Sequence, residues 1–233
     1  MSRGNRVLPI VAIGTAAVLL LGGCSADPLN IIILNARAPG DKCDFSDASL
    51  YTMGGSLDFR QWVDLNNNSG ISAYYFQQFS WENQLQPNPI SVNGQVTDPG
   101  GGNDFIADTI VYDYQYTDPN VTLGQEIANV RAVIPAGGLQ DKNRMNADLI
   151  QPKASAALLA TLTPTPQTLL VTFQAFGKLA AGASKHTNKV TFPLTVYNSA
   201  PGSPLSCPTG YVLYGGPCGV PGRDAVVHCI KSG

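Results

Sequence analysis

Apolar and polar residues alternate with a period of two along much of the chain between Cys43 and Cys207. In the segment TIVYDYQYT, residues 109–117, one face consists of Ile110, Tyr112, Tyr114 and Tyr116. In the segment KVTFPLTVY, residues 189–197, one face consists of Val190, Phe192, Leu194 and Val196. Such alternation is typical of strands with one buried and one solvated face, as in antiparallel sheets.

Four further segments have strand-like patterns, so that the chain is predicted to form about six strands. They are SLDFRQWVDL (56–65), AYYFQQFSW (73–81), EIANVRAVI (126–134) and TLLVTFQAF (168–176). Turn segments rich in Gly, Pro, Asn and Asp separate them. The Ala- and Leu-rich segment KASAALLATL, residues 153–162, predicts one short helix at an end of the sheets. A further strand is the alternative there, because the segment has no charged residue after Lys153 to mark the solvated face of a helix.

These elements predict an all-β fold, an immunoglobulin-like or fibronectin-like antiparallel β-sandwich with one short helix. A closed barrel is the alternative, which the long and uneven loops disfavour. The disulfide that joins strands B and F of antibody domains is not available, because no cysteine lies between Cys43 and Cys207. The expected parts are a signal peptide (1–23), a lipidated tether (24–50), the sandwich domain (51–200) and a disulfide-linked tail rich in Cys, Gly and Pro (201–233).

The N-terminal residues have the layout of an export signal. Arg3 and Arg6 form a short basic start, and an apolar run follows over residues 7–21. A membrane-spanning helix needs about 20 apolar residues, so this shorter run fits the apolar core of a signal peptide. Two glycines then precede Cys24. We therefore expect this segment to be removed during processing.

The segment LLGGC, residues 20–24, resembles the lipobox of bacterial lipoproteins. That resemblance implies that Cys24 is the lipidation site, with fatty acids such as palmitate on its sulfur and on the new amino terminus. Ser25 in place of Asp implies sorting to the outer membrane, on its periplasmic or cell-surface face. Several acyl chains, at roughly 0.8 kcal/mol per buried CH2, would give stable anchoring. An ordinary secretory signal that ends beside a cysteine is the alternative.

Length and charge narrow the function classes. Cleavage before Cys24 leaves 210 residues and, by removing Arg3 and Arg6, changes the formal net charge from −2 to −4. This length suffices for one large β domain or two small ones. With 14 Lys and Arg in the whole chain, the basic field that binds nucleic acid is absent. The expected membrane contact is therefore the lipid, and no nucleic acid is expected as a partner.

Four cysteines remain if Cys24 carries lipid. These disulfide candidates are Cys43, Cys207, Cys218 and Cys229. An even number in an exported chain predicts two disulfide bonds, and three pairings are open. The tail that holds the last three is poor in aliphatic residues and needs covalent links to keep a shape. A zinc site is the less favoured alternative, because the even ten-residue spacing is far from the short spacing of structural zinc sites.

Several loose motifs occur together along nearly the whole mature chain. They are the lipobox, the early Cys43, GGSLDF, IPAGG, NKVTFPLTVYN and the tail segment PCGVPGRDAVVHC. In this combination the chain resembles surface lipoproteins of uncharacterised activity from myxobacteria and related deltaproteobacteria. The resemblance implies a location and a fold and carries over no functional residue. Those proteins often have a cysteine after the last strand, where this chain has Tyr197-Asn198-Ser199.

Catalytic signatures are missing from the sequence. The two histidines, His186 and His228, match no nucleophile or metalloprotease motif, and no Walker loop occurs. The two glutamates are Glu82 and Glu126, and carboxylate pairs drawn from the aspartates are found in any acidic β protein. The sequence therefore predicts a protein that is not an enzyme and has no cofactor, with a hydrolase as the less favoured alternative.

Two acidic loops are candidates for calcium binding. DLNNNSG, residues 64–70, has oxygen ligands at three EF-hand positions, but its glycine is one place late and Tyr75 stands where the bidentate glutamate belongs. TDPGGGND, residues 97–104, presents Asp98 and Asp104. Plain turns explain both loops, because Asn, Asp and Gly are the residues that turns select. No metal site is predicted, although calcium remains an open alternative for both loops.

An aromatic cluster at residues 74–81 is the remaining candidate for binding. Alternation places Tyr75, Phe79 and Trp81 on one face of the expected strand, and Tyr74 and Phe76 on the other. An exposed aromatic row would offer a platform for a sugar or a protein partner. The more favoured interpretation is that Phe79 and Trp81 are covered by the chain itself.

Two classes of function follow from the sequence. The first is a lipid-anchored, non-catalytic cell-envelope module that binds a protein or glycan partner. The second is a purely structural envelope lipoprotein. An exposed aromatic patch favours the first class, and a uniformly polar surface favours the second.

We expect Cys24→Ser to abolish lipidation, because the serine oxygen cannot replace the sulfur that accepts the lipid. The variant should remain as uncleaved precursor or leave the detergent phase in phase partitioning. Metabolic labelling with palmitate, compared between wild type and a Cys229→Ser control, measures the acylation. A Cys24→Ser variant that is still processed and membrane-bound would contradict the lipoprotein interpretation.

Overall fold

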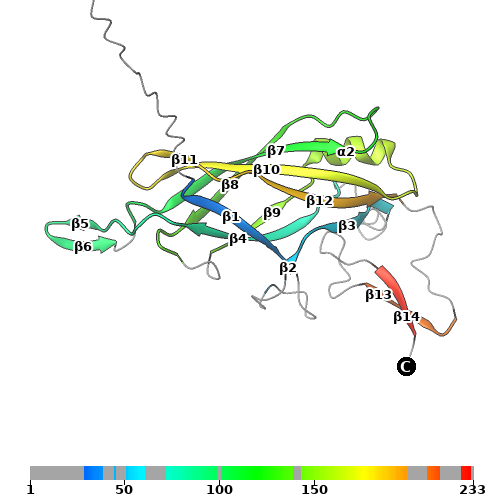
Figure 1. Cartoon of the computed structure of the whole chain (residues 1–233), viewed down its shortest axis with the longest axis horizontal. Coiled ribbons are helices and arrows are strands. Elements are labelled where there is room, and N and C mark those ends of the chain that lie inside the picture. Colours follow the sequence, from blue (N-terminus) through cyan, green and yellow to red (C-terminus); the bar gives the residue numbers. More distant parts are fainter. Residues whose placement is uncertain are drawn as a thin grey trace, which may run out of the picture.

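Figure 1 shows a computed structural model that describes residues 29–38, 45, 51–60, 72–98, 101–138, 143–198, 209–215 and 227–231, with the backbone alone at residues 98, 212–215 and 227–230. These residues form an all-β structure with one helix. Two sheets share a single core of buried side chains. The all-β class expected from the alternating pattern is therefore confirmed.

The smaller of the two packed sheets has the strand order β2-β1-β4-β9. Its strands are β1 (Ile31–Arg37), β2 (Tyr51–Thr52), β4 (Phe76–Asn83) and β9 (Arg144–Asp148). The larger sheet has the order β3-β12-β10-β7-β8, with β11 also paired to β10. Its strands are β3 (Gly55–Asp58), β7 (Phe105–Tyr116), β8 (Glu126–Ile134), β10 (Gln167–Leu179), β11 (Ser184–His186) and β12 (Val190–Tyr197). Neighbouring strands run antiparallel, except that β3 runs parallel to β12.

Two hairpins and a helix complete the described chain. The hairpins are β5 (Ile90–Val92) with β6 (Gln95–Asp98), and β13 (Tyr211–Gly215) with β14 (Val227–Lys231). The turn of the first hairpin is Asn93-Gly94, and both residues have the positive φ that a tight two-residue hairpin turn requires. Helix α2 (Pro152–Thr161) begins with a proline in its first turn, as helices tolerate, and confirms the helix expected over 153–162.

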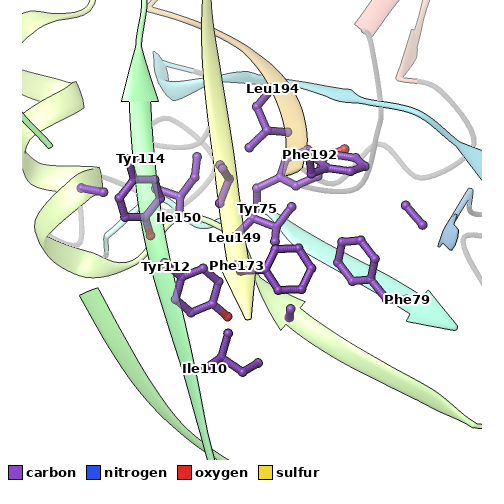
Figure 2. Close-up of a cluster of buried hydrophobic side chains, with 14 of the residues drawn as sticks. Tyr75, Phe79, Ile110, Tyr112, Tyr114, Leu149, Ile150, Phe173, Phe192 and Leu194 are labelled. Carbon is purple, nitrogen blue, oxygen red and sulfur yellow. The ribbon is translucent and has the colours of Figure 1, made fainter. Parts of the chain in front are cut away.

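Aromatic side chains join the two sheets (Figure 2). The ring of Phe79 on β4 lies 4.8 Å from the ring of Phe173 on β10 and 6.0 Å from that of Phe192 on β12. Tyr112 on β7 lies 6.1 Å from Phe173, so three strands of the larger sheet take part. Tilted and edge-to-face pairs at these separations stabilise by about 0.5–1.5 kcal/mol each beyond the burial of their area.

On β7 and β12, the apolar face predicted from the sequence is the face that is buried in the core. On β7 the side chains of Ile110, Tyr112 and Tyr114 are buried, and the residues between them are partly or fully exposed. On β12 the buried residues are Phe192, Leu194 and Val196. The period of two therefore predicted the core side of both strands correctly, because each strand packs on one face alone.

Two expected boundaries are wrong. The segment 56–65 was expected to be one strand, but β3 ends at Asp58, and Phe59 and Arg60 already have helical backbone. The Asp58 carboxylate accepts a hydrogen bond from the backbone N–H of Arg60 (3.0 Å), as the capping residue at the start of a helix does. The tether expected over 24–50 contains β1, which pairs along β4 and belongs to the sandwich. The side chain of Asn188 holds β1 in place through both the N–H (2.7 Å) and the C=O (3.0 Å) of Ile33.

We expect Phe173→Ala to lower the free energy of unfolding by about 3–5 kcal/mol, because it leaves a cavity between the sheets. Phe176→Ala on the same strand is the matched control. Its ring is 38% exposed on the opposite face, so we expect a loss below about 1 kcal/mol. Urea unfolding followed by fluorescence measures both variants. Equal losses would contradict the assignment of Phe173 to the centre of the core.

Candidate functional site

The aromatic residues expected as a partner-binding platform lie in the core. Tyr75, Phe79 and Trp81 are at most 1% exposed, so the hypothesis that they form an exposed platform is wrong, and the favoured interpretation of self-covered side chains holds. The alternation itself was read correctly, since Tyr74 on the opposite face is exposed. The second sheet covers these residues, with the ring of Phe192 lying 6.1 Å from Tyr75. Changes at Tyr75 or Trp81 therefore act through folding.

Several expected sites fall outside the described residues. These are Cys24, Cys43, Cys207 and Cys218, and the loop over residues 64–70. The backbone of Cys229 is described and lies opposite Leu213 in the β13–β14 hairpin. Asp104 has a structural role, because its carboxylate accepts a hydrogen bond from the backbone N–H of Ala136 (2.8 Å). Within the described ranges, no group of three His, Cys, Asp or Glu side chains is placed to hold a metal ion.

The two histidines and the two glutamates lie on four different strands. His186 lies on β11 of the larger sheet, whereas His228 lies on β14 of a separate two-stranded sheet. Glu82 lies on β4 of the smaller sheet, and Glu126 begins β8 of the larger one. Glu82 and Glu126 therefore lie on different sheets, and the strand that carries His186 does not pair with the strand that carries Glu126.

Glu126 caps helix α2 from a strand. Its two carboxylate oxygens accept hydrogen bonds from the backbone N–H groups of Lys153 (3.1 Å) and Ala154 (2.7 Å). The helix has no side-chain cap of its own at Gln151, so Glu126 satisfies donors that would otherwise be unpaired and places negative charge at the positive end of the helix.

Burial shifts the acidity of the groups beside this helix. The Tyr114 hydroxyl accepts a hydrogen bond from the backbone N–H of Gln151 (3.1 Å). Burial raises the pKa of the Tyr114 phenol, and that hydrogen bond offsets part of the rise. Burial likewise raises the pKa of the Asp148 carboxyl. The Tyr114 hydroxyl thus links β7 to the residue that precedes α2.

A shallow hollow of about 130 Å³ lies on the outer face of the larger sheet, away from the core. It is lined by Val111, Asp113, Gln125, Gln174, Phe176 and Lys189. Strand register explains the grouping, because Gln174 on β10 lies opposite Val111 on β7. The adjacent chain segments that lead into β8 and β12 supply Gln125 and Lys189.

Hydrogen bonds fix the polar wall of this hollow. The Gln125 amide donates to the Asp113 carboxylate (2.9 Å), and the Gln174 amide donates to the backbone carbonyl of Thr187 (2.6 Å). In the part of the chain that the structure describes, the Lys189 ammonium makes neither an ion pair nor a hydrogen bond. The ring of Phe176 is 38% exposed and lies 5.9 Å from the imidazole of His186.

The hollow therefore offers an acceptor, a cationic donor and an aromatic surface within a small area. A carboxylate and an ammonium group can bind hydroxyl, amide or charged groups, and a phenyl ring can pack on a sugar or an apolar side chain. Its volume is well below the 300–1,000 Å³ that is typical of enclosed small-molecule sites. It suits one protruding group of a larger partner.

Sequence reasoning missed this site. Alternation does place Val111 and Asp113 on the solvent side of β7, and Gln174 and Phe176 on the solvent side of β10. No sequence signal shows that these strands are neighbours in the sheet, with β10 between β7 and β12. The lining residues span positions 111 to 189, so their proximity follows from the topology.

A wider hollow of about 370 Å³ lies at one end of the same sheet. Its lining residues are Thr117, Asp118, Pro119, Pro166, Gln167 and Thr168. Its hydroxyl and backbone groups are largely used internally, since Thr117 both donates to the carbonyl of Thr168 (2.6 Å) and accepts from its N–H (2.9 Å). We therefore take the smaller hollow as the candidate site.

Comparisons with known proteins identify no relative. Neither a protein-family model, nor a curated protein, nor a solved structure matches the chain. Among the described residues, no helix has the length and apolar character needed to cross a membrane. The chemistry of the outer face therefore carries the functional argument.

We expect Glu126→Ala to lower the free energy of unfolding by about 1 kcal/mol, the usual cost of losing a helix cap. Glu126→Gln should lose less, because its carbonyl oxygen still accepts one hydrogen bond. His186→Ala should change stability by no more than about 0.5 kcal/mol, as for other surface substitutions. Urea unfolding measures all three. A loss for His186→Ala equal to that for Glu126→Ala would contradict the capping role.

Proposed function

We propose that this protein is a lipid-anchored, non-catalytic module of the cell envelope that binds a protein or glycan partner through the outer face of its larger sheet. The observation that carries the proposal is the hollow in which Asp113, Lys189 and the Phe176 ring meet. Two packed sheets hold this face rigid. Preorganised side chains on a rigid scaffold lose little conformational freedom on binding.

We also propose an immunoglobulin-like type for the sandwich. The strand orders support it: β1, β4 and β9 correspond to strands A, B and E of one sheet, and β12, β10, β7 and β8 to strands G, F, C and C′ of the other. Phe79 on β4 and Phe173 on β10 then stand on the strands that a disulfide joins in antibody domains. Tyr112 packs beside this pair from strand C, where antibody domains have a tryptophan.

The lipid anchor of the proposal rests on the sequence. The basic start, the apolar run and the LLGGC segment support acylation at Cys24, and Ser25 supports an outer-membrane location. An anchored module needs little affinity for the membrane itself, because the acyl chains supply it. The folded domain is then available for a partner.

The composition of the hollow favours binding over a purely structural role. Asp113 and Lys189 line the same hollow as the partly exposed Phe176, so polar recognition and apolar contact are combined. This combination is typical of contacts with sugars and with protein loops. A purely structural envelope protein is the alternative. Such a protein would not need charged and aromatic side chains grouped in one hollow.

We expect Phe176→Ala and Lys189→Ala each to weaken binding at least about fivefold, because truncating an interface hot spot costs more than 1 kcal/mol. The full chain in detergent is immobilised and probed separately with outer-membrane polysaccharide and with solubilised envelope proteins, by biolayer interferometry. Leu159→Ala is the control, since Leu159 is exposed on α2, outside the hollow.

The outcomes separate the alternatives. Binding of either probe that is weakened by both variants and unchanged in the control supports the proposal. Binding that both variants leave intact contradicts the use of this face. Absence of binding to both probes favours the structural alternative. A hydrolytic activity that is lost on changing His186 favours an enzyme.

A further inference from the structure

Strand β8 forms an open edge of the larger sheet. It pairs with β7 on one side and is the last strand in the sheet order. Among the described residues, no backbone hydrogen bond joins residues 126–133 to any segment other than β7. The unpaired N–H and C=O groups along such an edge are a template for another strand.

The other edges of the two packed sheets are shorter or more charged. β3 has four residues and ends at Asp58, and β9 has five residues with Arg144 and Asp148 at its ends. β8 has nine residues, and its central stretch, residues 127–133, carries one charge, on Arg131. Proteins usually block long edges with several charges or a proline. The open edge of β8 therefore calls for a partner.

The outward side chains of β8 include two large apolar residues. Ile127 is 65% exposed and Val133 is 56% exposed, with Asn129 and Arg131 exposed between them. The register with β7 shifts between Ala107 and Thr109, but exposure alternates along β8 without interruption. The free edge thus keeps the two-residue repeat that strand pairing needs.

The sequence of β8 is symmetric about Val130. Residues 127–133 read IANVRAV, so apolar Ile127 mirrors Val133, Ala128 mirrors Ala132, and polar Asn129 mirrors Arg131. In an antiparallel pair of identical strands, each residue lies opposite its mirror position. A two-fold interface requires this self-complementarity, because the same surface contributes both sides.

We propose that a second copy of this chain pairs with β8, antiparallel and centred on Val130. Ile127 of each copy then packs on Val133 of the other, and Asn129 lies opposite Arg131. Moving the centre to Arg131 would place two arginines opposite each other. Moving it to Asn129 would place Ile127 opposite Arg131. Cross-strand pairing penalises like charges and favours apolar pairs, so it selects the centre at Val130.

This pairing has a consequence for the outer face. Antiparallel pairing within one sheet keeps each face continuous, because directly opposite residues project to the same side. In each copy the hollow is lined by Val111, which lies opposite Ile127 on β8, so the hollow is close to the dimer interface. The hollows of the two copies would therefore face the same direction. If the proposed binding role holds, two sites on one face would bind a repetitive partner with avidity. The dimer itself does not depend on that role.

The test is the molar mass of the full mature protein in detergent. Light scattering, corrected for detergent and run with micelles in large excess over protein, should give a dimer. Val133→Lys should weaken the dimer roughly tenfold or more, because it disrupts both symmetric apolar pairs. Val96→Lys on the β5–β6 hairpin is the matched control, since Val96 is 57% exposed and lies outside β8.

A pair of variants at one position tests the register. Asn129→Asp places a carboxylate opposite Arg131 of the other copy and should tighten the dimer. Asn129→Lys places like charges there and should weaken it. A monomeric wild type, equal effects of Val133→Lys and Val96→Lys, or no difference between the two Asn129 variants would each overturn the proposal. A monomer would leave β8 as an edge for a different protein.

Discussion

The contact between the two sheets across Phe79 and Phe173 is the interaction on which the rest of the structure depends. The rings lie 4.8 Å apart and join the middle of β4 to the middle of β10. Phe192 and Tyr112 extend this contact to the strands on either side of β10. No cysteine lies between residues 43 and 207, so burial and aromatic packing hold the two sheets together.

Once the sheets are joined, buried polar side chains position the connecting segments. The amide of Asn83 is fully buried and donates to the carbonyls of Asn103 (2.9 Å) and Ile134 (3.0 Å), which ties β4 to the loop before β7 and to the end of β8. Asn188 holds β1, and Glu126 caps α2. Each of these side chains satisfies backbone groups that would otherwise be unpaired. These hydrogen bonds fix the connecting segments to the sheets.

Under the proposed function, the larger sheet uses one face for folding and the other for recognition. Its inner face is committed to the core, and the outer face and the β8 edge are free to vary. The hollow beside Phe176 and the apolar residues Ile127 and Val133 lie on this outer face. A substitution on the outer face alters the surface and leaves no cavity, whereas a smaller residue at Phe173 leaves a cavity in the core. Substitutions that tune the proposed binding and self-association would therefore cost little stability.

The alternation of apolar and polar residues was sufficient to predict the all-β class and the buried sides of β7 and β12, because these depend on the local repeat and on one-sided burial. The helix that begins at Pro152 was predicted from the Ala and Leu content of residues 153–162. Strand β1 was missed. Its start, IIIL, has no alternation, and it becomes a strand by pairing with β4 and binding Asn188, which lies 155 residues from Ile33. Alternation grouped Tyr75, Phe79 and Trp81 correctly, but which face the second sheet would cover was a tertiary property. The hollow likewise required the tertiary structure, because strand order alone brings Asp113, Phe176 and Lys189 to one place.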